Sequence, residues 1–221
     1  GYVYRESANY VEAEMHYREC IPLLERLSAG SLTLADAYDD LGGVMYANNK
    51  SDEAIAILSH ALDLAEQSED AAKIIANIHF HIAHIYNAQN DWVSSEEHFR
   101  KYISFIEGVE DIDRDMLSDI FLQYASVLIA LNKNKEAIDV ILRVLSLLPE
   151  NNLQHIQDLH LKLGRLYNLE GDLAESEKHY ADRITVLESV VDIDCGVLAD
   201  AYDDLGIVMY ANNKSDEAIA I

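Results

Sequence analysis

The chain has 221 residues, half of which are apolar, so it is long enough to bury a substantial core. It contains only two prolines and nine glycines, and this scarcity favours long helices over a strand-rich fold, in which turn signals recur every ~8–12 residues. With 40 acidic and 16 basic residues the net charge is −24, which repels phosphate backbones and anionic headgroups, so we expect neither nucleic-acid binding nor membrane adsorption. The same charge attracts a basic partner, although it also serves solubility alone.

The first complete predicted helix covers residues 10–27. Its apolar residues recur at helical spacing, and we expect Cys20 among them to be buried. Pro22 lies inside this helix, lacks an amide hydrogen and is expected to kink the last turns. Cys20 and Cys195 are too few and too far apart for a disulfide framework. The sequence shows no signal peptide, membrane-length apolar run or lipidation motif, so we expect a cytoplasmic location, with the reservation that the chain opens and stops inside helical patterns.

The next predicted element is an antiparallel pair of helices. Tyr38, Leu41, Gly42 and Met45 lie at i, i+3, i+4 and i+7, which is one stripe of an amphipathic helix. A polar NNKS turn follows, and a second helix then carries small and large apolar residues at helical spacing. Three later segments repeat this scheme, each with a polar turn inside the pair.

Internal repetition is the strongest signal in the chain. Residues 34–57 return as residues 198–221 with one change, from Gly43 to Ile207. Polar residues recur in the copy together with the apolar ones, which indicates copied sequence. A shorter period, of roughly 40 residues, also separates a series of small residues, and a second small residue follows each of them at a constant interval. The series consists of Gly1, Gly42, Ala83, Ala125, Gly164 and Gly206, and the second small residues are Ala13, Ala54, Ser95, Ala137, Ser176 and Ala218.

This arrangement resembles the tetratricopeptide repeat family, in a variant with about 40 residues per unit instead of 34. The resemblance covers the whole chain and implies an all-α, right-handed superhelical solenoid of antiparallel helix pairs, which counts as one elongated domain. The pattern departs from the family at His79 and His160, where an aromatic residue opens the motif elsewhere, and at Tyr102 and Arg183, where a small residue is expected. The expected units are residues 1–30 (partial), 31–69, 70–111, 112–150, 151–194 and 195–221 (partial).

Catalytic motifs are absent from the sequence, which has no phosphate loop, HExxH, CxxC or GxSxG. We therefore expect no enzymatic activity and no cofactor. His79, His81 and His84 form a cluster that suggests a metal site, but His79 occupies the aromatic packing position, as His160 does, so a hydrogen-bonded core imidazole is the preferred interpretation. No metal is predicted.

Two pairs of adjacent acids also suggest catalysis, Asp39–Asp40 and Asp203–Asp204. Adjacent side chains on a helix diverge by about 100°, so neither pair can form a facing dyad. A solvated helix face is the preferred interpretation.

Binding is the function that the resemblance implies, on the inner wall formed by the first helix of each pair. On these helices the residues at i, i+4 and i+7 form a stripe that faces a partner. Its amides can bind an extended peptide backbone, its apolar residues can contact the side chains of the peptide, and its aspartates can pair with Lys or Arg. Arg5 and Arg165 are the only cations on it, so we do not expect the carboxylate-gripping mode of some family members. The predicted partner-binding residues are Asp39, Tyr46, Phe80, His84, Asn87, Leu122, Ser126, Ile129, Leu161, Arg165, Asn168, Asp203 and Tyr210, with Gly43 and Ile207 on the same stripe.

The sequence therefore predicts a non-enzymatic protein–protein interaction scaffold that binds a basic or amphipathic peptide segment on its concave face. Three alternatives remain at this stage. The stripe is merely a solvated surface; the chain self-associates end to end through uncapped terminal repeats; or it is a regulatory sensor module of a larger protein.

Overall fold

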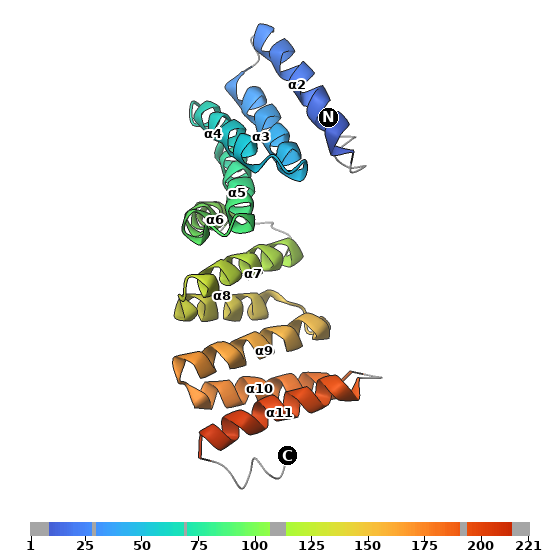
Figure 1. The fold of residues 1–221 in the computed structure, drawn as a ribbon, viewed down its shortest axis with the longest axis vertical. Helices are drawn as coiled ribbons and strands as arrows, with labels where there is room; N and C mark the ends of the chain where they lie inside the picture. Colours follow the sequence, from blue (N-terminus) through green and yellow to red (C-terminus); the bar gives the residue numbers. More distant parts are fainter. Residues whose placement is uncertain (1–8, 28–29, 69, 107–113, 191–193, 214–221) are drawn as a thin grey trace. The chain divides into compact units, whose positions relative to one another are not determined.

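The computed structural model describes residues 9–27, 30–68, 70–106, 114–190 and 194–213; Gly1 and Arg5 lie outside this part of the chain. The described residues form helices joined by short turns and contain no strand (Figure 1), which confirms the predicted all-α class. The helices are α2 (Tyr10–Arg26), α3 (Ser31–Ala47), α4 (Ser51–Ala65), α5 (Ala72–Ala88), α6 (Trp92–Ile106), α7 (Arg114–Ala130), α8 (Asn134–Leu147), α9 (Leu153–Glu170), α10 (Leu173–Glu188) and α11 (Cys195–Ala211).

The helices belong to two compact units, an N-terminal unit of residues 1–111 and a C-terminal unit of residues 112–221. In the N-terminal unit α3 packs on α4 and α5 packs on α6, and α2 lies against α3. In the C-terminal unit the pairs are α7 with α8 and α9 with α10, and α11 packs on α10. The predicted division into six repeats of one solenoid stays a prediction. No helix in the described ranges combines the length and apolarity needed to cross a bilayer.

The two helices of a pair touch most closely at the repeated small residue. A Cβ atom on Gly42 of α3 would lie 2.5 Å from Cγ of Leu58 on α4, and a Cβ on Gly164 of α9 would lie 2.8 Å from the Tyr180 ring on α10. Real Cβ atoms essentially never come so close to another heavy atom. The small residue is therefore a steric requirement of the pair, as the repeat pattern predicts.

A buried serine reinforces this contact in two of the pairs. The Ser95 hydroxyl of α6 donates to the carbonyl oxygen of Ala83 on α5 at 2.9 Å, and Ser176 of α10 donates to the carbonyl of Gly164 on α9 at 2.7 Å. Both serines are fully buried, and the bond satisfies a hydroxyl that would otherwise destabilise the core. Each bond joins the second helix of a pair to the first.

The turns inside the pairs share one backbone conformation. Asn49, Asn90, Asn132 and Asn213 have φ values of 57° to 61°, and Gly171 has a φ of 80°. This left-handed region is open to glycine and, among residues with a Cβ, best tolerated by asparagine. Each of these residues lies seven positions after the small residue of its unit, so the reversal of the chain occurs at the same point in every described pair.

The burial predicted for Cys20 is wrong, because both cysteines are exposed. On α2 the buried apolar residues are Ala13, Tyr17 and Ile21, which follow one another at i, i+4 and i+8. Ile21 fills the position next to the core, and the side chain of Cys20 projects about 100° away from it. The thiol is therefore an accessible group.

Two adjacent glycines of α3 test the steric role of the small residue. Gly42→Ala forces a Cβ into Leu58, so we expect a net destabilisation of about 1–3 kcal/mol even though alanine favours the helix. Gly43→Ala meets only the His81 ring at 3.6 Å, an ordinary contact, and should stabilise the chain by up to about 1 kcal/mol. Urea unfolding followed by circular dichroism measures both. Equal effects of the two substitutions would contradict the steric explanation.

Candidate partner-binding surface

In the N-terminal unit, the predicted stripe begins with a carboxylate that is already engaged. Asp39 of α3 is only 5% exposed, and its Oδ1 lies 2.7 Å from Nδ1 of His81 on α5. The His81 ring also lies against Gly43 of α3. Asp39 therefore helps to hold α3 and α5 together, and its charge is shielded from a partner.

The other stripe residues of the N-terminal unit keep part of their surface accessible. Tyr46 of α3 and Phe80, His84 and Asn87 of α5 are all half-buried. The Phe80 ring meets His84 edge to face at a centroid distance of 4.4 Å and lies 5.0 Å from the Tyr102 ring of α6. Burial is the main cause that lowers the pKa of His84, so the imidazole is neutral at pH 7. Phe80 and His84 therefore form an uncharged aromatic surface on α5.

In the C-terminal unit, the stripe is more exposed. Ser126, Arg165, Asn168, Asp203 and Tyr210 are exposed, Tyr210 to 70%. The aliphatic members are half-buried, and they are Leu122, Ile129 and Leu161. Polar groups and partly exposed apolar ones therefore both occur along α7, α9 and α11.

The nearly identical sequences of α3 and α11 allow equivalent positions to be compared in two settings. Asp39 is buried under His81 of α5, whereas its copy Asp203 is exposed. Tyr46 is half-buried, whereas its copy Tyr210 is exposed. Between residues 34 and 47 the two copies differ at one position, where Gly43 becomes Ile207. The contact from His81 shows that α5 contributes to the burial of Asp39.

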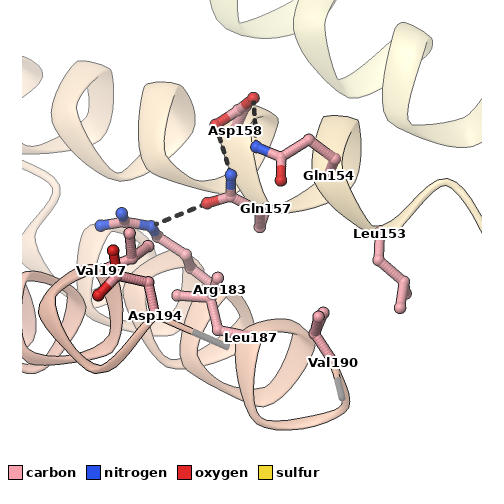
Figure 2. A pocket seen from close by; sticks show the side chains of 9 residues that line it. All are labelled: Leu153, Gln154, Gln157, Asp158, Arg183, Leu187, Val190, Asp194 and Val197. Carbon is pink, nitrogen blue, oxygen red and sulfur yellow. Dashed lines mark hydrogen bonds between the residues drawn. The ribbon is translucent and has the colours of Figure 1, made fainter. Parts of the chain in front are cut away.

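The sequence analysis missed a pocket of about 470 Å³ in the C-terminal unit, formed by α9, α10 and the start of α11 (Figure 2). The guanidinium of Arg183 is buried there; its Nε donates to Gln157 Oε1 at 3.4 Å and one Nη donates to Asp204 Oδ2 at 2.9 Å. The carboxylates of Asp158 and Asp194 also line it. The sequence signal for this pocket was Arg183, which occupies a position where the repeat pattern has a small residue. The lining residues are Leu153, Gln154, Gln157, Asp158, Arg183, Leu187, Val190, Asp194 and Val197.

A smaller pocket of about 220 Å³ includes one residue of the predicted stripe. Leu122 of α7 lines it together with residues from α7, the end of α8 and the start of α9. Asp119 and His155 supply polar groups at its edge.

The two histidines at the aromatic packing position are core imidazoles, as predicted. His79 of α5 is buried and its Nδ1 lies 3.0 Å from Nδ1 of His98 on α6. Burial, reinforced by the charges of His98 and Lys101, lowers the pKa of His79 to about 4. His81 contacts Asp39 and His84 contacts Phe80, so the three neighbouring histidines do not converge.

The equivalent pair in the C-terminal unit has the same geometry. His160 of α9 is buried, and its Nδ1 lies 3.1 Å from Nδ1 of His179 on α10. Burial is the main cause that lowers the pKa of both imidazoles. In each pair, one ring nitrogen donates and the other accepts, so the two neutral rings are of opposite tautomers.

Comparison with known proteins shows a sequence match in the N-terminal unit and a shared fold over most of the chain. Residues 1–67 match a family model described as "Tetratricopeptide repeat", and no curated protein sequence matches the chain. The structure of YrrB, described as a TPR protein with an unusual peptide-binding site, is 20% identical, with a TM-score of 0.60 over 84% of this chain and 81% of that one.

Two further solved structures share the fold. A putative kinesin light chain from Podosopora anserina, with nearly identical TPR-like repeats, is 13% identical, with a TM-score of 0.60 over 87% of this chain and 92% of that one. The apo form of RapI is 10% identical, with a TM-score of 0.66 over 98% of this chain and 69% of that one. The sequence match to the tetratricopeptide repeat family covers residues 1–67, and the solved structures show the shared fold over most of the chain. The greater length of the repeat unit stays a prediction.

The copied aspartates provide a matched pair of stability tests. Asp39→Ala removes the acceptor of His81 and leaves a buried gap, so we expect a loss of about 1–3 kcal/mol. Asp203→Ala changes the same local sequence at an exposed site and should stay within about 0.5 kcal/mol of the parent chain. Chemical unfolding of the two variants measures the difference, and equal losses would show that the His81 contact contributes nothing.

The neutral imidazole of His79 makes stability dependent on pH. Its pKa is lowered from 6.5 to about 4 in the folded chain, so the unfolded chain takes up a proton first as the pH falls. Its contribution to stability is complete above pH ~6.5 and is lost progressively down to pH ~4. His79→Phe, which restores the family's aromatic residue, should flatten this part of the profile in urea unfolding at a series of pH values. An unchanged slope would contradict the assignment.

Proposed function

We propose that the chain is a non-enzymatic scaffold that binds a basic or amphipathic peptide segment on the face formed by the first helices of its pairs, the face that the family resemblance predicts to be concave. Tetratricopeptide repeats serve generally as protein–protein interaction scaffolds. The observation that carries the finer proposal is accessibility. Among the predicted binding residues, Asp39 alone is buried, and the others are half-buried or exposed.

The chemistry of this face matches a peptide with basic and apolar side chains. Asn87 and Asn168 present amides that both donate and accept, as an extended backbone requires. Tyr46, Phe80 and Tyr210 offer aromatic surface, and aromatic side chains on rigid helices bind at a low cost in conformational entropy. The net charge of −24 favours a partner with Lys or Arg.

The larger pocket of the C-terminal unit adds a seat for one such side chain. Its apolar lining from α9, α10 and α11 suits the methylene stem of a lysine or arginine, and the carboxylates of Asp158 and Asp194 suit the charged end. Arg183 does not cancel these charges, because its guanidinium is already paired with Asp204. A long basic side chain therefore fits this pocket better than an acidic one.

A charge reversal tests the binding face. We expect a fluorescently labelled amphipathic peptide with lysines on one helical face and leucines on the other to bind, and its glutamate counterpart not to bind. Asp203→Lys, on the exposed stripe of α11, should weaken the lysine peptide about three- to tenfold. Asp63→Lys makes the same charge change on the exposed surface of a second helix, α4, and should have a much smaller effect. Fluorescence anisotropy at several salt concentrations measures the affinity of both variants. Equal weakening by the two substitutions would show that the peptide responds only to the overall charge of the chain.

A second candidate function is end-to-end self-association, and the comparison of α3 with α11 favours it. Ile207 and Tyr210 are 66% and 70% exposed on α11, and Gly43, the equivalent of Ile207 in α3, lies against His81 of α5. A helix from a second copy, packed as α5 packs on α3, would cover them. Tyr210→Glu should then reduce the average mass measured by light scattering across a concentration series. A parent chain that stays monomeric throughout would rule this candidate out.

A further inference from the structure

Three potential metal ligands converge in the C-terminal unit. His160 comes from α9, and His179 and Asp182 lie three residues apart on one face of α10. Nδ1 of His160 lies 3.1 Å from Nδ1 of His179 and 3.8 Å from Oδ2 of Asp182. The three potential ligand atoms all lie within 4.8 Å of one another. In the part of the chain that the structure describes, these residues form the one cluster with such an arrangement.

These separations are close to those that a bound ion imposes. Zinc binds imidazole nitrogen and carboxylate oxygen at about 2.0–2.2 Å. In a tetrahedral site two such ligand atoms are therefore about 3.3–3.5 Å apart. The observed 3.1 and 3.8 Å bracket this range, and no two ligand atoms of the set are more than 4.8 Å apart.

The surroundings suit a cation at this point. The rings of His160 and His179 are buried, while the Asp182 side chain is 46% exposed, so an ion could enter from solvent beside the carboxylate. Burial lowers the pKa of both histidines, and neutral imidazole is the form that binds metal. The Tyr167 ring stacks on His179 at 5.4 Å and restrains its orientation. Lys178 of α10 pairs with Glu175 at 3.0 Å, and Arg183 of α10 pairs with Asp204 at 2.9 Å.

We propose that His160, His179 and Asp182 bind a divalent transition-metal ion such as Zn²⁺, with two imidazole nitrogens and one carboxylate oxygen as ligands and water in the remaining position. The donor set of nitrogen and oxygen suits Zn²⁺, Co²⁺ or Ni²⁺ better than Mg²⁺ or Ca²⁺, which prefer oxygen alone. An ion held in this way joins α9 to α10. It therefore stabilises the folded C-terminal unit.

The N-terminal unit contains a matched pair of histidines without the third ligand. The interval in sequence from His79 to His160 equals that from His98 to His179, and the Nδ1 atoms of His79 and His98 are 3.0 Å apart. Lys101 stands where the other unit has Asp182, and it pairs with Glu97 at 2.7 Å. An ammonium group repels a metal ion and cannot ligate it. The chain thus carries its own control for the proposed site.

Two reciprocal substitutions test the proposal in the full chain. Zn²⁺ is titrated calorimetrically in excess Mg²⁺, which occupies the acidic surface, and thermal unfolding is followed in parallel by circular dichroism. We expect one Zn²⁺ per chain and a raised Tm. Asp182→Lys, which recreates the arrangement of the N-terminal unit, should weaken binding by at least about tenfold. Lys101→Asp should raise the stoichiometry to two by creating a second site.

A further variant separates ligation from folding. His160→Phe places an aromatic residue where Phe121 stands in another unit, so it keeps the packing position filled and removes one ligand. We expect helicity to be retained and Zn²⁺ binding to be lost. The proposal is overturned if Asp182→Lys and His160→Phe bind Zn²⁺ as the parent chain does, or if Lys101→Asp adds no site.

Discussion

The close approach of paired helices at one small residue is the contact on which the rest of this structure depends. At Gly42 and Gly164 there is no space for a Cβ between the two helices. This contact constrains the rotation of the first helix about its own axis, because the small residue must face the partner helix. The stripe residues, three positions before the small residue and one position after it, then point away from the partner helix. The accessible stripe is therefore a geometric consequence of a buried contact.

The same contact sets the register between facing helices. It brings His79 to His98 and His160 to His179, and the separation in sequence is the same in the two pairs. A histidine in the aromatic packing position needs a polar partner when buried, and the second helix supplies one each time. The repetition of the histidine pair thus follows from the repetition of the small residue that aligns the two helices.

Much of the fold could be predicted because its determinants are local: the small residue, its counterpart on the second helix and the helical spacing around both. The burial of the stripe residues could not be predicted, since Asp39 is buried by His81, which lies on a different helix and 42 residues further along the chain. The histidine pairs were missed because the search for metal ligands followed a single helix. The equal spacing within the two pairs was the signal. The asparagines with positive φ carried a similar signal in the sequence, because each of them lies seven positions after a small residue.

Binding and metal ligation use different sides of the same helix. His160 points toward α10, whereas the next residue, Leu161, begins the accessible stripe that continues through Arg165 and Asn168; adjacent helical side chains diverge by about 100°. An ion between α9 and α10 would therefore leave the stripe uncovered while restraining the helix that presents it. A helix that is restrained before binding loses less conformational entropy when a partner binds, so the binding free energy is more favourable. A metal site in this position would act on affinity through rigidity, without contributing a contact of its own.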